Sequence, residues 1–150
     1  MAEKVYTTRA LVIGERASGE ASKVFTLFTR DLGLVQAYAR SVREVRSKLR
    51  FNLSLHNFSR ITLVPGREYW KVIGAEESRG GPPASVCVLL TRFLGAHEPH
   101  LELFDELLAG GEEQELTLTI LDRLGYVGRK AESPGDREKL IDRALYASHL

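Results

Sequence analysis

Short apolar stretches alternate with turn-forming residues in the first half of the chain, a pattern typical of β-strands. The pattern predicts five strands, at residues 5–15, 23–29, 34–39, 58–64 and 67–73. Residues 10–13 are apolar without alternation, so we expect the first strand to be buried on both faces. A strand of that kind suits a small barrel with a further layer packed outside it.

Turn-forming residues predict how these strands connect. We expect a loop at residues 14–21, a tight hairpin at residues 31–33 with Gly33 available for positive φ, and a turn at Pro65-Gly66. The single long connection follows the third strand. Five closely connected strands with a short helix at that place are the layout of an OB-fold β-barrel. An SH3-like barrel is the alternative, but it accounts less well for the helix.

The second half of the chain has a helical period. Residues 80–83 (Gly-Gly-Pro-Pro) can continue neither a strand nor a helix. Beyond them, apolar residues recur at i, i+3, i+4 and i+7 from Val86 onward. Further helices are predicted to begin at Pro99, at about Glu112 and near Pro134.

We therefore predict an α+β chain with an N-terminal five-stranded OB-fold barrel and a small all-α C-terminal domain packed on it. The expected divisions are a barrel at residues 1–78, a linker at 79–83 and a helical domain at 84–150. The 43% apolar content of the 150 residues agrees with a globular chain. No apolar run approaches the roughly 20 residues that span a bilayer, and the N-terminus lacks a signal-peptide pattern.

Composition also limits the chemistry of the chain. The single cysteine, Cys87, excludes an internal disulfide and a multi-thiolate zinc site, so we expect a reducing cytoplasmic setting. Cys87 lies on the apolar face of a predicted helix and is expected to be a small buried hydrophobe. His97 and His100 are three residues apart, but Pro99 disrupts the spacing of a metal pair. The sequence therefore implies no metal, no cofactor and no enzymatic site.

Charge is distributed unevenly along the chain. Residues 1–78 carry 13 Lys and Arg against 8 Asp and Glu, a net charge of +5. Residues 79–150 carry 8 against 12, a net charge of −4, and the two halves together give the +1 of the whole chain. A basic first half and an acidic second half indicate different partners for each, although chance could also produce so small an imbalance.

The most one-sided segment of the chain is residues 40–50, with five basic residues and one acidic residue. As a helix over residues 43–53, it would place Arg43, Arg46 and Arg50 on one face and apolar residues on another. Alternatively, Ser47 caps a helix that starts at Lys48 and the preceding residues form a loop. Both interpretations place the cations on the surface of the protein. We hypothesise that they bind phosphate there. The alternative is a solvated basic connection without a ligand.

A nucleic-acid site requires a basic track and surfaces on which bases stack. The aromatic residues of the predicted strands are expected mainly in the core, and Tyr38, next to the basic segment, is the best stacking candidate. The predicted nucleic-acid-binding residues are Arg40, Arg43, Arg46, Lys48, Arg50, Arg60, Arg67, Lys71 and Tyr38.

These stretches, taken together, resemble the RecO family of bacterial recombination mediators. The resemblance covers about residues 6–127, and its motifs are fairly specific in their order and spacing. They lie at residues 10–13, 19–22, 27–33, 39–43, 46–50, 98–104 and 121–126. The chain departs from the family at Ser22, where an acidic residue is frequent. It also lacks the cysteines of the family's zinc element after residue 126, and its C-terminal part is shorter than usual.

The resemblance implies a barrel that binds single- and double-stranded DNA, annealing of complementary strands and assistance to recombinase loading. It also implies contacts with RecR and with single-stranded-DNA-binding protein, which the short helical part puts in question. We expect a non-enzymatic, cytoplasmic, nucleoid-associated mediator of recombinational DNA repair. The alternatives are a protein-interaction adaptor without DNA binding of its own and an OB-fold RNA-binding protein.

Overall fold

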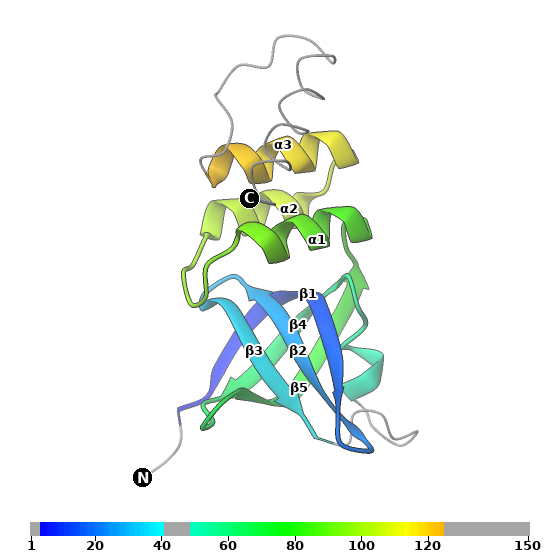
Figure 1. Cartoon of the computed structure of the whole chain (residues 1–150), viewed down its shortest axis with the longest axis vertical. Helices are drawn as coiled ribbons and strands as arrows, with labels where there is room; N and C mark the ends of the chain where they lie inside the picture. The colour runs from blue at the N-terminus through cyan, green and yellow to red at the C-terminus, as the bar shows by residue number, and fades with distance from the viewer. Residues whose placement is uncertain (1–3, 41–48, 125–150) are drawn as a thin grey trace.

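Five strands close into a barrel, and three helices stack at one end of it (Figure 1). In this computed structural model the described residues are 4–40 and 49–124. Around the barrel the strands follow the order β1-β2-β3-β5-β4. The strands are β1 (Tyr6–Ser18), β2 (Ser22–Thr29), β3 (Gly33–Ala39), β4 (Asn57–Val64) and β5 (Trp70–Gly80). The helices are α1 (Ala84–Phe93), α2 (Leu101–Ala109) and α3 (Glu113–Arg123), and a 3-10 turn, η1 (Leu49–Phe51), precedes β4.

The barrel has a closed apolar interior. Ala10 and Val12 of β1 face this interior together with residues from all the other strands. Leu53, which follows η1, also contributes to it and is buried. Short side chains such as Ala37 and Ala39 line β3, where a narrow barrel leaves little room. The strand pairing is antiparallel except between β3 and β5, which run parallel.

The outer face of the barrel forms a second core with the helices. Leu11 and Ile13 alternate with the inward residues of β1 and pack in this core with Phe28 of β2 and Phe58 of β4. Phe104 of α2 lies at the centre, with edge-to-face contacts to Phe28 at 5.3 Å and to Phe58 at 5.6 Å between ring centroids. The first strand is therefore buried on both faces, as its unbroken apolar run predicts.

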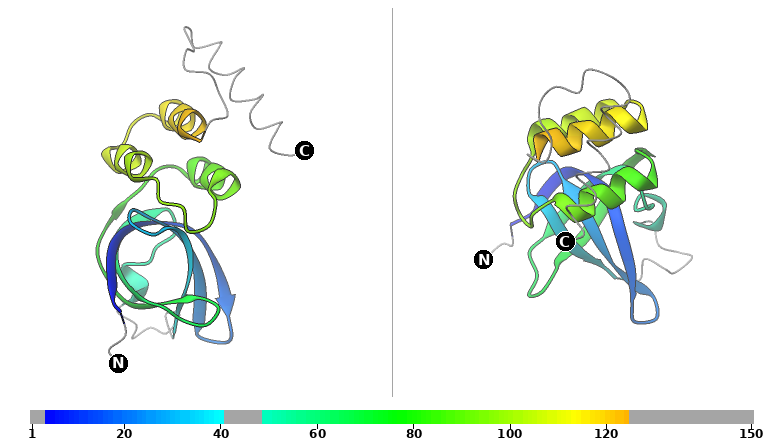
Figure 2. Two further views of the ribbon diagram at one scale, coloured as in Figure 1. Left: turned by 90° about the vertical axis from the view of Figure 1, so that its left-hand side faces the viewer. Right: turned by 45° about the horizontal axis from the view of Figure 1, so that its top comes forward.

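α1 and α2 pack on this outer face, and α3 lies against them, furthest from the barrel (Figure 2). α1 begins directly after Pro83 and buries Val86, Cys87, Leu89 and Leu90 on one face. Because these residues recur at helical spacing, burying them requires a partner surface along one side of the helix. The barrel and the helix α3 supply that surface.

The chain between α1 and α2 is also joined to the barrel. The backbone N–H of His97 donates to the carbonyl of Leu34 at 2.9 Å, and Ala96 forms a parallel bridge with Leu34. At the same end, the side chain of Thr29 donates to the carbonyl of Gly33 at 2.7 Å and closes the β2–β3 hairpin. The barrel end and the helical segment therefore meet around the start of β3.

The structure confirms the α+β class, the five-stranded barrel and the hairpin between β2 and β3. Some boundaries differ from the sequence-based expectation. β1 continues to Ser18, through residues expected to form a loop, because it pairs with β2 from Ala10 to Ser18, with a bulge between Val12 and Gly14. β5 begins only at Trp70 and continues to Gly80, because it pairs with β4 as far as Asn57. α2 begins at Leu101 rather than at Pro99.

Two predictions fall on parts of the chain outside the described residues. The helix-or-loop alternatives for the basic segment fall mainly on residues 41–48, and the final helix falls within residues 125–150. Within the described part of the chain, the three-residue turn η1 is the only helical element between β3 and β4. The division into domains at residues 78 and 84 remains a prediction.

Candidate nucleic-acid interface

Three of the predicted DNA-binding residues line one open concavity of about 390 Å³, which we call the Tyr38 concavity. It is lined by Tyr38, Arg67, Glu68, Tyr69 and Lys71. The parallel register of β3 and β5 places Tyr38 directly beside Lys71. Since neighbouring strands lie about 5 Å apart, an aromatic ring and an ammonium group share one small surface here.

Tyr38 is held in place by the neighbouring strand. Its hydroxyl donates to the Ser22 hydroxyl at 3.0 Å, and its side chain is half-buried. The resemblance to the family leads us to expect an acidic residue at position 22. In this chain the residue is Ser22, so the partner of the Tyr38 hydroxyl is a neutral hydroxyl group. A fixed aromatic ring beside two cations has the elements that a single strand requires, a stacking surface and phosphate partners.

The basic segment begins next to this concavity. Arg40 directly follows Ala39, the last residue of β3, and is exposed. Arg43, Arg46 and Lys48 lie outside the described residues. Arg50 belongs to η1, but its side chain also lies outside the description. The structure therefore places the start of the segment near Tyr38 and leaves its other cations as a prediction from sequence.

Arg60 lies apart from the other described candidates. It is on β4, opposite Arg9 of β1, and the two arginines line a concavity that does not include Arg67 or Lys71. Its guanidinium group is 3.5 Å from Glu76 and 3.7 Å from Glu77. These acidic neighbours compete with phosphate for the same guanidinium, so the environment of Arg60 is less favourable for binding DNA than that of Lys71.

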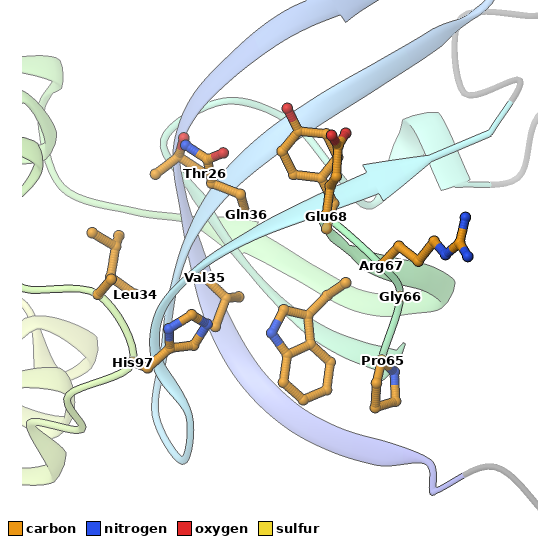
Figure 3. A pocket seen from close by; sticks show the side chains of 12 residues that line it. Thr26, Leu34, Val35, Gln36, Pro65, Gly66, Arg67, Glu68 and His97 are labelled. Carbon is orange, nitrogen blue, oxygen red and sulfur yellow. The ribbon is translucent and has the colours of Figure 1, made fainter.

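A larger hollow adjoins the Tyr38 concavity and was not foreseen from the sequence. It has a volume of about 480 Å³ and lies between the barrel and the α1–α2 connection (Figure 3), so we call it the junction pocket. Arg67, Glu68 and Tyr69 line both hollows. The residues lining the junction pocket are Thr26, Leu34, Val35, Gln36, Pro65, Gly66, Arg67, Glu68, Tyr69, Trp70, Ala96 and His97.

One further cation reaches this surface from β1. The guanidinium of Arg16 lies 5.4 Å from the centre of the Tyr69 ring and also donates a hydrogen bond to the Tyr69 hydroxyl. Arg16 is not among the residues predicted from the sequence, because residues 14–21 were expected to form a loop. Only the long β1–β2 hairpin brings Arg16 to the residues before β5.

Other residues that the sequence raised as candidates have structural roles in the core. Cys87 is fully buried, as expected, and burial raises the pKa of its thiol to about 11. Phe25 and Phe28 are buried core residues, as the sequence favours. Among residues 4–40 and 49–124, no group of three or more His, Cys, Asp or Glu side chains is arranged to hold a metal ion. None of the described helices has the length and apolar character required to cross a membrane.

Comparison with known proteins identifies relatives of the whole described fold. Residues 1–77 match the family described as Recombination protein O N terminal. The DNA repair protein RecO of Dehalococcoides mccartyi strain 195 is 28% identical over an alignment 165 residues long, which covers 95% of this chain and 65% of that protein. The DNA repair protein RecO of Heliobacterium modesticaldum is 31% identical over an alignment 144 residues long, which covers 82% of this chain and 52% of that protein.

A further relative aligns over a shorter region. The DNA repair protein RecO of Dehalococcoides mccartyi strain CBDB1 is 35% identical over 71 residues, covering 47% of this chain and 28% of that protein. The chain thus spans less than two thirds of the length of each of these relatives. The family match covers the barrel strands up to the middle of β5.

Proposed function

This chain belongs to the RecO family, and from that premise we propose that it is a non-enzymatic mediator of DNA repair that binds DNA through its barrel. The observation that supports this proposal most directly is the placement of Tyr38, Arg67 and Lys71 around one open concavity, with Arg40 beginning the basic segment beside it. The relatives share the name DNA repair protein RecO.

The proposed mode of binding is electrostatic and independent of sequence. Lys and Arg neutralise phosphates and release counterions, while the Tyr38 ring offers a stacking surface. We assign the phosphate contacts to Arg40, Arg67 and Lys71, together with Arg43, Arg46, Lys48 and Arg50 of the basic segment. Arg60 is assigned a smaller part because of its acidic neighbours.

The finer activities are proposed from the resemblance of the sequence to the family. They are binding of both single- and double-stranded DNA, annealing of complementary strands and assistance to recombinase loading within the bacterial nucleoid. RecR and single-stranded-DNA-binding protein are the proposed protein partners, and the acidic helical half is the proposed surface for them. A surface of opposite charge to the barrel would keep protein partners separate from DNA.

The test is fluorescence anisotropy of labelled single-stranded DNA, titrated with the protein at several salt concentrations. For single strands, the log–log slope is about −0.7 per phosphate contact. Replacing Arg43, Arg46, Lys48 and Arg50 with Ala is expected to make the slope shallower by up to about 3, with an unchanged circular dichroism spectrum. The double variant Arg67→Ala/Lys71→Ala is expected to reduce the slope by about 1.4.

A matched control removes two positive charges elsewhere. Arg92→Ala/Arg123→Ala takes one cation from α1 and one from α3, outside the linings of both hollows, and we expect little change in slope. Failure of the wild-type protein to bind DNA at low salt would contradict the proposal. It would favour the alternative of a protein-interaction adaptor without DNA binding of its own. Stronger competition by RNA than by DNA of the same sequence would favour the RNA-binding alternative.

A further inference from the structure

The junction pocket joins three parts of the chain that are distant in sequence. Gln36 comes from β3, Arg67 and Glu68 come from the β4–β5 connection, and His97 comes from the α1–α2 connection. Figure 3 shows Gln36 and Glu68 along one side of the pocket and His97 and Arg67 on opposite sides of the view. We propose that this pocket takes one unstacked base of a bound single strand. This inference rests on the proposed function and specifies where a base is held.

His97 is fixed at the pocket in a backbone conformation that is uncommon for residues other than glycine. Its φ is +58°, in the left-handed region, and its backbone N–H is held by the Leu34 carbonyl. A non-glycine residue there carries a conformational cost, which tends to be found at functional sites. His97 is exposed, so burial in the core does not account for its side chain. The imidazole instead forms part of the pocket wall.

Trp70 gives the pocket an aromatic surface with a fixed orientation. The indole is partly buried and contacts the Tyr6 ring edge-to-face, with 5.3 Å between centroids and an angle of 86°. A large ring held in this way loses little freedom when a ligand stacks on it. Base stacking on aromatic side chains contributes about 1–3 kcal/mol per base and tolerates any base.

The polar groups of the pocket suit a base better than a phosphate. The Gln36 amide offers both donors and an acceptor, which is what the edge of a base requires. The Glu68 carboxylate only accepts, so it fits an exocyclic amino group such as N4 of cytosine. A volume of about 480 Å³ also lies within the usual range of small-ligand sites.

A continuous surface leads to the pocket. Arg67, Glu68 and Tyr69 line both the junction pocket and the Tyr38 concavity. Gln36 and Tyr38 are two residues apart on β3, which is a distance of about 7 Å along a strand. A single strand held by Lys71 and Arg67 through its phosphates therefore passes the mouth of the pocket, where one base can turn inward.

The sole tryptophan of the chain, Trp70, provides a direct reporter. We would titrate the full chain with oligo(dC) and with an abasic strand of the same length, following tryptophan fluorescence and, in parallel, anisotropy of the labelled strands. Quenching by oligo(dC) and not by the abasic strand is expected. Equal responses to both strands, or binding of oligo(dC) without any fluorescence change, would overturn the pocket while leaving DNA binding intact. Absence of binding in the anisotropy measurement would overturn the proposed function as well.

A matched pair of variants tests the pocket without removing the reporter. His97→Gly removes the imidazole and relieves the positive φ, so we expect an intact fold and about 5-fold weaker binding of oligo(dC), with little change for the abasic strand. His56→Gly removes the same side chain from the same backbone region, with φ +68°, outside the pocket lining. It is expected to bind oligo(dC) like the wild type. Equal affinities of the two variants for oligo(dC) would contradict the assignment.

Discussion

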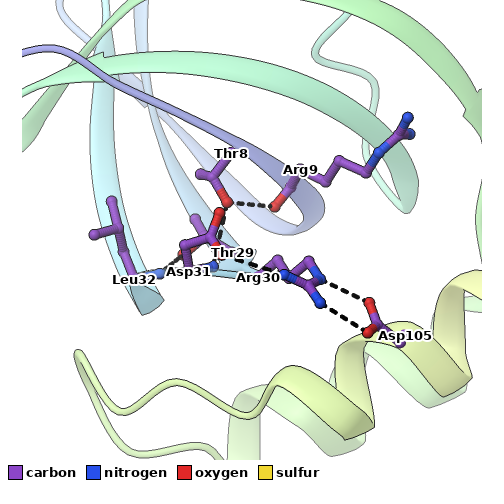
Figure 4. Close-up of polar contacts among 7 residues, drawn as sticks. All are labelled: Thr8, Arg9, Thr29, Arg30, Asp31, Leu32 and Asp105. Atoms are coloured by element: carbon purple, nitrogen blue, oxygen red, sulfur yellow. Dashed lines mark hydrogen bonds and ion pairs between the residues drawn. The ribbon is translucent and has the colours of Figure 1, made fainter.

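Arg30, just after β2, and Asp105 of α2 form two parallel hydrogen bonds between the barrel and the helical segment (Figure 4). The distances are 2.8 Å from Nε to Oδ1 and 3.0 Å from Nη2 to Oδ2. The planar guanidinium fork matches the carboxylate in this arrangement, which fixes orientation as well as distance. The hydrogen bonds from Arg30 lower the pKa of Asp105 below its ordinary value of 3.8. The pair therefore links the end of β2 to α2.

The Arg30–Asp105 pair predicts a dependence of stability on pH. Because the folded-state pKa of Asp105 is lowered, its contribution is present above about pH 4 and is lost as the pH falls through the folded-state value. Asp105→Asn is expected to lower the thermal unfolding midpoint modestly at pH 7. The difference from wild type should disappear in strong acid. Glu20→Gln, at an exposed residue of the β1–β2 turn, is the control, and a difference that persists unchanged at low pH would contradict the prediction.

Phe104 is predicted to be a major determinant of the contact between the barrel and the helices. It is fully buried between Phe28 and Phe58, so Phe104→Ala removes contacts with both strands. We expect a loss of about 3–5 kcal/mol in the free energy of unfolding, measured by urea denaturation. Leu101→Ala on the same helix is the control, because Leu101 is 45% exposed and should cost far less. Similar losses for the two variants would show that the aromatic cluster has no special role.

Gly33 is predicted to be required where β3 meets the α1–α2 connection. Its φ is +72°, and a Cβ there would lie 2.6 Å from backbone atoms of Glu98. Gly19 has a similar φ of +68°, but nothing lies within 4 Å of a Cβ built on it. We expect Gly33→Ala to destabilise the chain by more than Gly19→Ala, which itself costs about 1 kcal/mol from backbone strain alone. Equal unfolding midpoints for the two variants would contradict the close packing at Gly33.

Cys87 is predicted to be chemically inert in the folded chain. The side chain is fully buried, and burial raises the pKa of its thiol to about 11, so the reactive thiolate is scarce at neutral pH. A thiol-reactive chromogenic disulfide should label the native protein far more slowly than the protein in denaturant. Rapid labelling of the native protein at pH 7 to 8 would show that α1 opens readily from the barrel.

The sequence predicted the elements of this fold because the apolar periodicity reports burial directly. The unbroken apolar run in β1 indicated a strand with two buried faces, and the two faces are the barrel interior and the helix-covered exterior. The boundaries were less predictable. Arg16 and Arg79 are polar residues of extended strands, and pairing with a neighbouring strand, rather than their own propensity, makes them part of β1 and β5.

The candidate site was likewise predictable from the sequence only in part. The charge pattern by itself pointed to the basic segment, since clustered charge is visible in a linear sequence. Arg60, Arg67 and Lys71 were added to the prediction as cations of predicted strands. The grouping of Tyr38 with Lys71, and the separation of Arg60 from both, follow from the β3–β5 pairing, which joins residues 33 positions apart. Gln36, Trp70 and His97 carry no common sequence signal. Only closure of the barrel against the helical segment brings them around one pocket, because that proximity is a property of tertiary packing and not of local pattern.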